Sequence, residues 1–213
     1  MKFRIATPEE EAIVLLSLIK QRPCPELVLA SKIPISKKDY IKIKKSRRIK
    51  EVLPIIKSLK SKNKNIEEIK LKIEKEWNLN KKILEKKLNK FGIKINNKIK
   101  VVLMPHIRYG LYNPNKGIIY VPFKCKISLI LHELIHIWFW KNIQRFGIEK
   151  NKASWLVSEA LASLISQEIG PKYKTDFCKE IAPYRKKLKA LWKNKKLAIF
   201  IKNAYKELRS RSK

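Results

Sequence analysis

The sequence predicts an α+β fold that is mostly helical, with a small antiparallel or mixed sheet of about three strands. Apolar residues recur at helical spacing over most of the chain, while residues 98–121 change to β-branched runs separated by turn residues. Hydrophobic residues make up 45% of the 213 residues, enough for one good core. We expect an N-terminal helical arm or lobe (1–60), a core that holds the sheet (61–175) and basic C-terminal helices (176–213).

The N-terminal lobe is expected to begin with a capped helix. Thr7, Pro8 and Glu10 follow the order of an N-cap, a first-turn proline and a capping-box glutamate, so a helix should run from here to about residue 23. A second, shorter helix is expected over residues 25–30. Residues 36–64 indicate a basic connecting arm, helical in part over 50–60, which either binds an anionic partner or is a solvated linker.

The core should contain helices followed by strands. Asn65 and Glu68 have capping-box spacing at the start of one helix, and another helix follows and ends at Gly92. Residues 98–104 then predict a strand. Residues 108–112 and 117–121 predict a β-hairpin, because the turn sequence Asn-Pro-Asn-Lys lies between them.

Helical spacing returns after the hairpin. We expect helices over residues 127–146, ended by Gly147, and over 152–169, ended by Gly170. Two basic helices should follow from residue 176 to the end, and Pro183 should interrupt the first of them.

The charge of the chain is strongly positive. There are 51 Lys and Arg residues against 18 Asp and Glu, a formal net charge of +33. Such a charge attracts polyanions, so nucleic acid is a possible partner, although lysines that only solvate helix faces would give the same composition.

The sequence also indicates the compartment. Cys24, Cys125 and Cys178 show no paired spacing, which is typical of free thiols rather than of a disulfide framework. Three glutamates, Glu9–Glu11, precede the first apolar run, where a signal peptide needs positive charge. We therefore expect a cytoplasmic protein with no membrane span.

One motif carries chemistry. His132, Glu133 and His136 form an H-E-x-x-H pattern within a strongly helical segment. Histidines at positions i and i+4 lie on one face of a helix, so both imidazoles can bind one ion, and Glu133 can accept a proton without being a ligand. Zn²⁺ fits this ligand set, because it accepts imidazole and carboxylate with one position left open.

A catalytic zinc ion needs a third protein ligand, and no histidine follows His136. Glu149 lies too close to the end of the motif helix. Glu159 and Glu168 lie on opposite sides of the next helix, so at most one of them can face the metal. We favour Glu159 over Glu168, because small residues around Glu159 allow a close approach of the two helices.

The sequence resembles the gluzincin metallopeptidases, in which an active-site helix is followed by a glutamate helix. The resemblance lies in the motif, in the 22 residues between His136 and Glu159, and in the sequence Ser-Glu-Ala-Leu-Ala-Ser around Glu159. The order of elements is similar to the compact minigluzincins and covers residues 64–170. The resemblance implies a zincin-like core over 61–175 and a zinc peptidase with His132, His136 and Glu159 as ligands and Glu133 as general base.

The resemblance also implies a substrate site. The strand Ile118, Ile119, Tyr120 and Val121 is similar to the edge strand along which such peptidases bind an extended peptide or protein substrate. The oxyanion-stabilising histidine or tyrosine of larger relatives has no clear match. The candidates for this role are His106, Arg108, Tyr120 and Tyr184, each of which also fits a loop, strand or surface position.

A second hypothesis belongs to another class of function. The charge of +33 and the unmatched oxyanion residue are also compatible with a basic polyanion- or nucleic-acid-binding protein whose metal site is structural or inactive.

Overall fold

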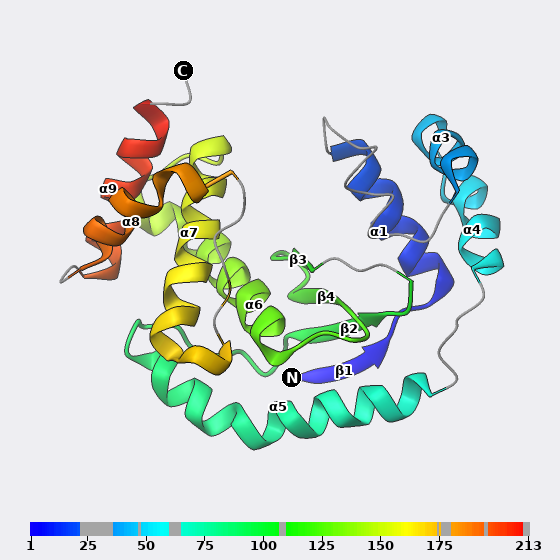
Figure 1. Cartoon of the computed structure of the whole chain (residues 1–213), viewed down its shortest axis with the longest axis horizontal. Helices are drawn as coiled ribbons and strands as arrows, with labels where there is room; N and C mark the ends of the chain where they lie inside the picture. Colours follow the sequence, from blue (N-terminus) through cyan, green and yellow to red (C-terminus); the bar gives the residue numbers. More distant parts are fainter. Residues whose placement is uncertain are drawn as a thin grey trace.

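The computed structural model describes residues 1–21, 36–46, 48–59, 65–106, 110–173, 175, 180–193 and 196–210. They form three layers: one small sheet in the middle and a layer of helices on each of its faces. Further helices pack outside (Figure 1). This confirms the mostly helical α+β class. The sheet is mixed and has four strands among the described residues, one more than expected.

The sheet has the order β1-β2-β4-β3. Strands β1 (Lys2–Ile5), β2 (Lys100–Met104) and β4 (Ile118–Pro122) are parallel, while β3 (Leu111–Asn113) pairs antiparallel with β4. The predicted hairpin is therefore present in β3 and β4. Its turn is held by the Lys116 backbone N–H, which donates to Asn113 Oδ1 at 3.0 Å.

Strand β1 was not predicted from the sequence. Phe3 pairs in register with Val101 of β2, and its side chain enters the core on one face of the sheet. The first residues of the expected N-terminal lobe therefore share the sheet with the expected core.

The first layer consists of α1 (Pro8–Gln21), α3 (Lys37–Lys45) and α4 (Ile49–Ser58). The expected cap of α1 is formed, because the Glu10 N–H donates to Thr7 Oγ1 at 3.3 Å and the Thr7 N–H donates to Glu10 Oε2 at 3.1 Å. These helices pack on the sheet face that carries Val102 and Met104. The short helix predicted over residues 25–30 lies outside the described residues.

Helix α5 (Ile66–Asn89) covers the opposite face of the sheet. Two helices were expected here, and this prediction was wrong, because the apolar face of Ile73 and Trp77 continues without a break into Leu84 and Leu88. The expected capping box is also not formed: the Asn65 amide donates to the Glu68 carboxylate at 2.9 Å and makes no hydrogen bond to the helix backbone.

Helices α6 (Ile127–Asn142) and α7 (Lys152–Ile169) lie on the same face as α5 and pack against each other. A 3-10 turn, Ile143–Phe146, extends α6 to Gly147, whose φ of 64° ends the segment as expected. Helix α7 has the predicted bounds, with a capping box between Asn151 and Ser154.

The C-terminal segment forms α8 (Arg185–Trp192) and α9 (Leu197–Ser210), which pack outside α7 (Figure 1). Pro183 lies in a 3-10 turn, Ala182–Tyr184, just before α8. Within the described parts of the chain, Cys125 is a free thiol, and no helix there is long and apolar enough to cross a bilayer.

Candidate metal centre

Helix α6 presents both histidines of the motif to one point in space. Because His132 and His136 are separated by one helical turn, their Nε2 atoms approach each other to 3.0 Å. His136 is 1% exposed and Glu133, between them in sequence, is 5% exposed. The motif therefore lies inside the protein, where its polar atoms need partners.

Helix α7 brings a carboxylate to the same point. Glu159 Oε2 lies 3.4 Å from His132 Nε2, and Glu159 Oε1 lies 3.4 Å from His136 Nε2. One ligand atom from each of the three residues falls within 4.8 Å of the others, so this His-His-Glu group could hold a metal ion.

The spacing of the three groups fits such an ion. A tetrahedral ion with bonds of about 2.0–2.1 Å to nitrogen and oxygen places its ligand atoms about 3.3 Å apart. The observed separations of 3.0, 3.4 and 3.4 Å surround this value. The two histidines and the carboxylate therefore form three corners of a site of the right size, although the size does not identify the metal.

The competing carboxylates lie elsewhere. Glu168 is exposed and accepts a hydrogen bond from Trp192 Nε1 at 3.1 Å. Glu149 is exposed and lies 3.7 Å from Arg209. The structure thus brings Glu159, the favoured candidate, to the histidine pair. The buried side chains of Ser158, Ala160, Ala162 and Ser163 allow α6 and α7 to pack closely around it.

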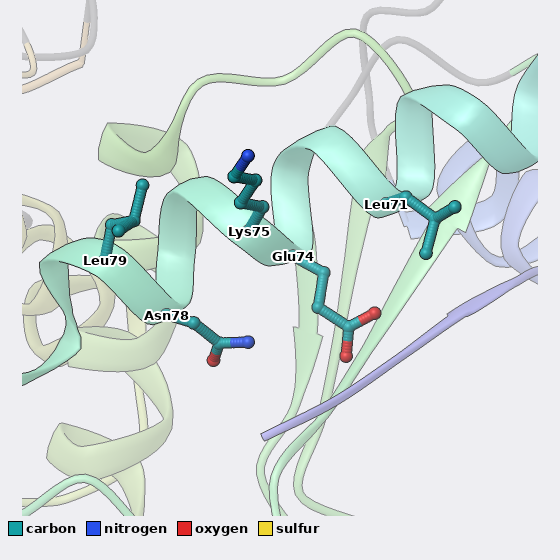
Figure 2. Close-up of a pocket in the computed structure, with 5 residues that line it drawn as sticks. All are labelled: Leu71, Glu74, Lys75, Asn78 and Leu79. Carbon is teal, nitrogen blue, oxygen red and sulfur yellow. The ribbon is translucent and has the colours of Figure 1, made fainter.

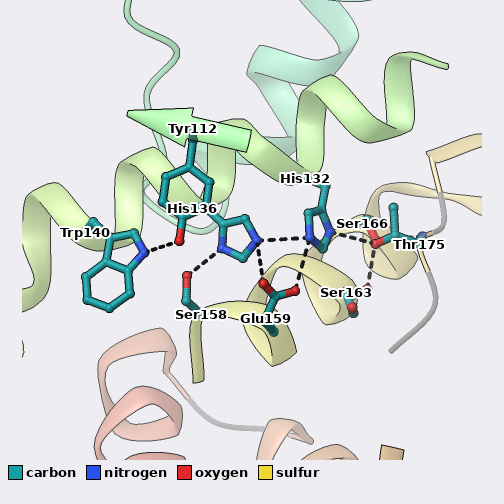
Figure 3. A network of polar contacts seen from close by, with 9 residues as sticks. All are labelled: Tyr112, His132, His136, Trp140, Ser158, Glu159, Ser163, Ser166 and Thr175. Atoms are coloured by element: carbon teal, nitrogen blue, oxygen red, sulfur yellow. Dashed lines mark hydrogen bonds and ion pairs between the residues drawn. The ribbon is translucent and has the colours of Figure 1, made fainter. Parts of the chain in front are cut away.

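Hydroxyl groups orient both imidazoles from behind (Figure 3). His136 Nδ1 lies 2.6 Å from Ser158 Oγ, and His132 Nδ1 lies 3.2 Å from Thr175 Oγ1, which in turn lies 2.8 Å from Ser166 Oγ. Since each Nδ1 is engaged, each Nε2 is left to face Glu159. Such outer contacts commonly set the orientation of histidine ligands in metal sites.

A tyrosine of β3 completes the wall of the site. The Tyr112 ring stacks on the His136 imidazole with centroids 4.7 Å apart and an interplanar angle of 23°. Its hydroxyl accepts a hydrogen bond from Trp140 Nε1 at 2.6 Å (Figure 3). Burial raises the pKa of Tyr112 above its usual range, so the phenol is neutral and keeps this arrangement.

The electrostatics of the motif follow from its burial. Burial lowers the pKa of His136 to about 3, which keeps the imidazole neutral. Burial also raises the pKa of Glu133 to about 8; the charge of His132 opposes this rise and that of Glu159 adds to it. A neutral imidazole is the form that ligates metals, and a divalent cation at this site would favour the carboxylate form of Glu133.

The backbone of Gly110 lies against Glu133. A Cβ atom at this position would come within 2.3 Å of Glu133 Oε1 and 2.9 Å of Leu129 Cδ1. Any larger residue here would require the Glu133 and Leu129 side chains to shift, so the residue just before β3 is coupled to the carboxylate of the motif.

The expected substrate strand is corrected by the sheet order. Ile118, Ile119, Tyr120 and Val121 belong to β4, which pairs with β2 on one side and with β3 on the other. Ile119 and Val121 are buried in the core beside α6, while Ile118 and Tyr120 face the layer of α1 and α4. Strand β4 therefore is not an edge, and among the strands that the structure describes β3 is the terminal one on the side of the metal centre.

Two of the four oxyanion candidates, His106 and Tyr120, make their contacts away from the metal centre. His106 contacts Glu11 of α1, with Nδ1 2.6 Å from Glu11 Oε2. Tyr120 packs on the opposite face of the sheet, and Tyr184 lies in the 3-10 turn before α8. Arg108 falls outside the described residues.

Sequence reasoning missed the supporting residues Tyr112, Trp140, Ser158, Ser166 and Thr175. For Ser158, the one indication in the sequence was its position directly before the candidate ligand Glu159.

Comparison of the chain with family models, with curated proteins and with solved structures found no match.

Proposed function

We propose that this chain is a zinc-dependent peptidase of the gluzincin type. The observation that carries the proposal is the convergence of His132, His136 and Glu159 from two helices, with the buried Glu133 beside them. Together with the H-E-x-x-H spacing, this arrangement matches the needs of hydrolysis by a metal-activated water.

Zinc suits the donor set. Two imidazole nitrogens and one carboxylate leave a fourth tetrahedral position open, which is typical of catalytic rather than structural zinc sites. When bound, the ion supplies Lewis acidity that activates water and polarises a carbonyl group.

The chain itself supplies the proton transfers and the orientation. Glu133 accepts a proton from the attacking water and passes it to the leaving amine, a role suited to a buried carboxylate whose ionised form a neighbouring divalent cation would favour. Ser158 and Thr175 hold the two imidazoles in register. Tyr112 excludes water from one face of His136 by stacking on it.

The outer edge of strand β3 supports an extended peptide as the substrate. Strand β3 is the terminal strand and directly precedes the hairpin turn, and Gly110 before it touches Glu133. An extended peptide added to the outer edge of β3 would lie beside the proposed general base, held mainly through backbone hydrogen bonds. This replaces β4 with β3 as the proposed substrate-binding strand.

Peptide cleavage tests the proposal. The zinc-loaded protein is incubated with a mixture of extended peptides, and the products are identified by mass spectrometry. We expect cleavage that a chelator stops and added zinc restores. Glu133→Gln should abolish it while zinc remains bound, and the exposed Glu168→Gln should cleave like the wild type. Cleavage that survives in Glu133→Gln would contradict the proposal.

The net charge of +33 favours a second candidate, a polyanion-binding protein with a structural or inactive metal site. Salt-sensitive retention on DNA or RNA that is equal in the wild type and in Glu133→Gln, with no peptide cleavage in either, would favour it.

A further inference from the structure

Helix α5 exposes large apolar side chains on the outside of the molecule. Leu71, Leu79 and Ile83 are 59%, 72% and 53% exposed, although the opposite face of the same helix is buried in the core. The three lie on one side of α5, and the 12 residue steps from Leu71 to Ile83 correspond to about 18 Å along its axis. In Figure 1 this helix runs along the outer boundary of the fold, beneath the sheet.

The exposed charges beside these side chains are mostly positive: Glu67 and Glu68 are exposed one turn before Leu71, and lysines follow them along the helix. From residue 71 to residue 90, every charged side chain classed as exposed is a lysine: Lys72, Lys75, Lys82, Lys86 and Lys90. The glutamates of the same stretch, Glu74, Glu76 and Glu85, are half-buried, and Glu74 lies between Leu71 and Leu79 on this side of the helix. The exposed face of α5 thus combines aliphatic side chains with flexible cations.

The shape of the face limits what can bind there. An open hollow on α5 is lined by Leu71, Glu74, Lys75, Asn78 and Leu79, all on consecutive turns of this one helix (Figure 2). All of the lining residues come from α5, so this hollow is not a groove with a wall on each side, such as holds a helix in helix-in-groove complexes. A second copy of the chain would bring lysines against lysines, which is unfavourable.

We propose that the exposed face of α5 is a docking surface for an anionic lipid bilayer. Aliphatic residues surrounded by lysines suit a membrane interface, where the apolar side chains enter the acyl boundary and the lysine stems extend toward lipid phosphates. Nucleic acid would satisfy the lysines but would leave three aliphatic side chains in water. The positive charge and the exposed Leu71, Leu79 and Ile83 together favour lipid.

Vesicle flotation tests the proposal with the full-length protein. Vesicles of phosphatidylcholine with about 30% phosphatidylserine are compared with vesicles of phosphatidylcholine alone. The wild type should float with the anionic vesicles and not with the neutral ones, and high salt should weaken the binding. No flotation with anionic vesicles at low salt would overturn the proposal.

Two matched pairs of variants locate the surface. Replacing Lys72, Lys75, Lys82 and Lys86 with Gln should weaken binding on the order of 10²–10³-fold. Replacing four exposed lysines of α8 and α9 (Lys186, Lys189, Lys202 and Lys206) removes the same charge and should have a small effect. Equal losses in the two variants would mean that only the total charge attracts lipid, which would overturn the proposal.

The apolar side chains are tested in the same way. Replacing Leu71, Leu79 and Ile83 with Gln should weaken binding about 10-fold or more. The matched variant replaces Ile13, Ile41 and Ile199, which are 48%, 43% and 45% exposed on other helices, and should bind like the wild type. Unchanged binding in the α5 variant would overturn the proposal, because it would leave only adsorption of charge. Circular dichroism confirms that each variant is folded.

Discussion

Replacing Gly110 with alanine should displace the carboxylate of Glu133 without removing any side chain of the site. The added Cβ would lie 2.3 Å from Glu133 Oε1, whereas real contacts essentially never fall below 3.0 Å. The carboxylate must therefore move by at least about 0.7 Å, the difference between these distances. Leu129 Cδ1 lies 2.9 Å from the same Cβ, so the Leu129 side chain must shift as well.

The magnitude follows from this displacement. A shift of about 1 Å at a reacting group can lower activity on the order of 100-fold, so kcat/KM for peptide cleavage should fall by about this factor in Gly110→Ala. The loss of stability should be about 1–3 kcal/mol, the usual range for an extra methyl group in a packed site. Metal content should stay at the wild-type level, because Gly110 contacts the motif at Glu133.

A double-mutant cycle in urea separates this contact from a general effect of alanine. In the Glu133→Ala background the obstructing carboxylate is gone, so Gly110→Ala should cost much less than in the wild type. Gly147→Ala is the comparison variant: its φ of 64° makes alanine costly, but open space surrounds it and cleavage should persist. Equal costs of Gly110→Ala in both backgrounds would refute the proposed contact.

Three further predictions concern the metal ligands and His106. Ser158→Ala should weaken metal affinity about 10–100-fold in competition with a chelator, because His136 loses its orienting hydroxyl, and an unchanged affinity would count against that role. Excess zinc, at about 100 times its Kd, should stabilise the wild type by about 2.7 kcal/mol but not His132→Ala, as followed by thermal unfolding. The hydrogen bond to Glu11 raises the pKa of His106, so its contribution to stability should be full below about pH 6.5 and decline as pH rises through the raised value. Urea titrations should therefore show that His106→Ala costs about 1.5–3 kcal/mol at pH 6 and less at pH 9, whereas a constant cost would contradict this account.

Local patterns predicted the elements that depend on local chemistry. Each of these elements is set by residues close together in sequence. Examples are the cap of α1 at Thr7, the hairpin turn at Asn113, and each of the two ends of α7. The histidine pair was predictable for the same reason, because one helical turn separates its members. Glu159 was predictable only as a choice among carboxylates, since its position depends on how α7 packs on α6.

Features that depend on distant pairing were missed or misassigned. Strand β1 has only four residues, and its partner β2 lies nearly a hundred residues away in sequence, so no local pattern reveals it. The hairpin pattern predicted strand β4 correctly, but it could not show that strand β2 pairs with the other edge of β4. The contact of Tyr112 with His136 likewise depends on the placement of the sheet edge over α6.

Metal content tests the central claim most directly. The purified protein is reconstituted with zinc, dialysed and measured by elemental analysis, together with His132→Ala, Glu159→Ala and the exposed Glu168→Ala. We expect about one zinc ion per chain in the wild type and in Glu168→Ala, and a loss of zinc in the other two variants. Zinc retained in Glu159→Ala, or none bound by the reconstituted wild type, would contradict the proposed metal centre.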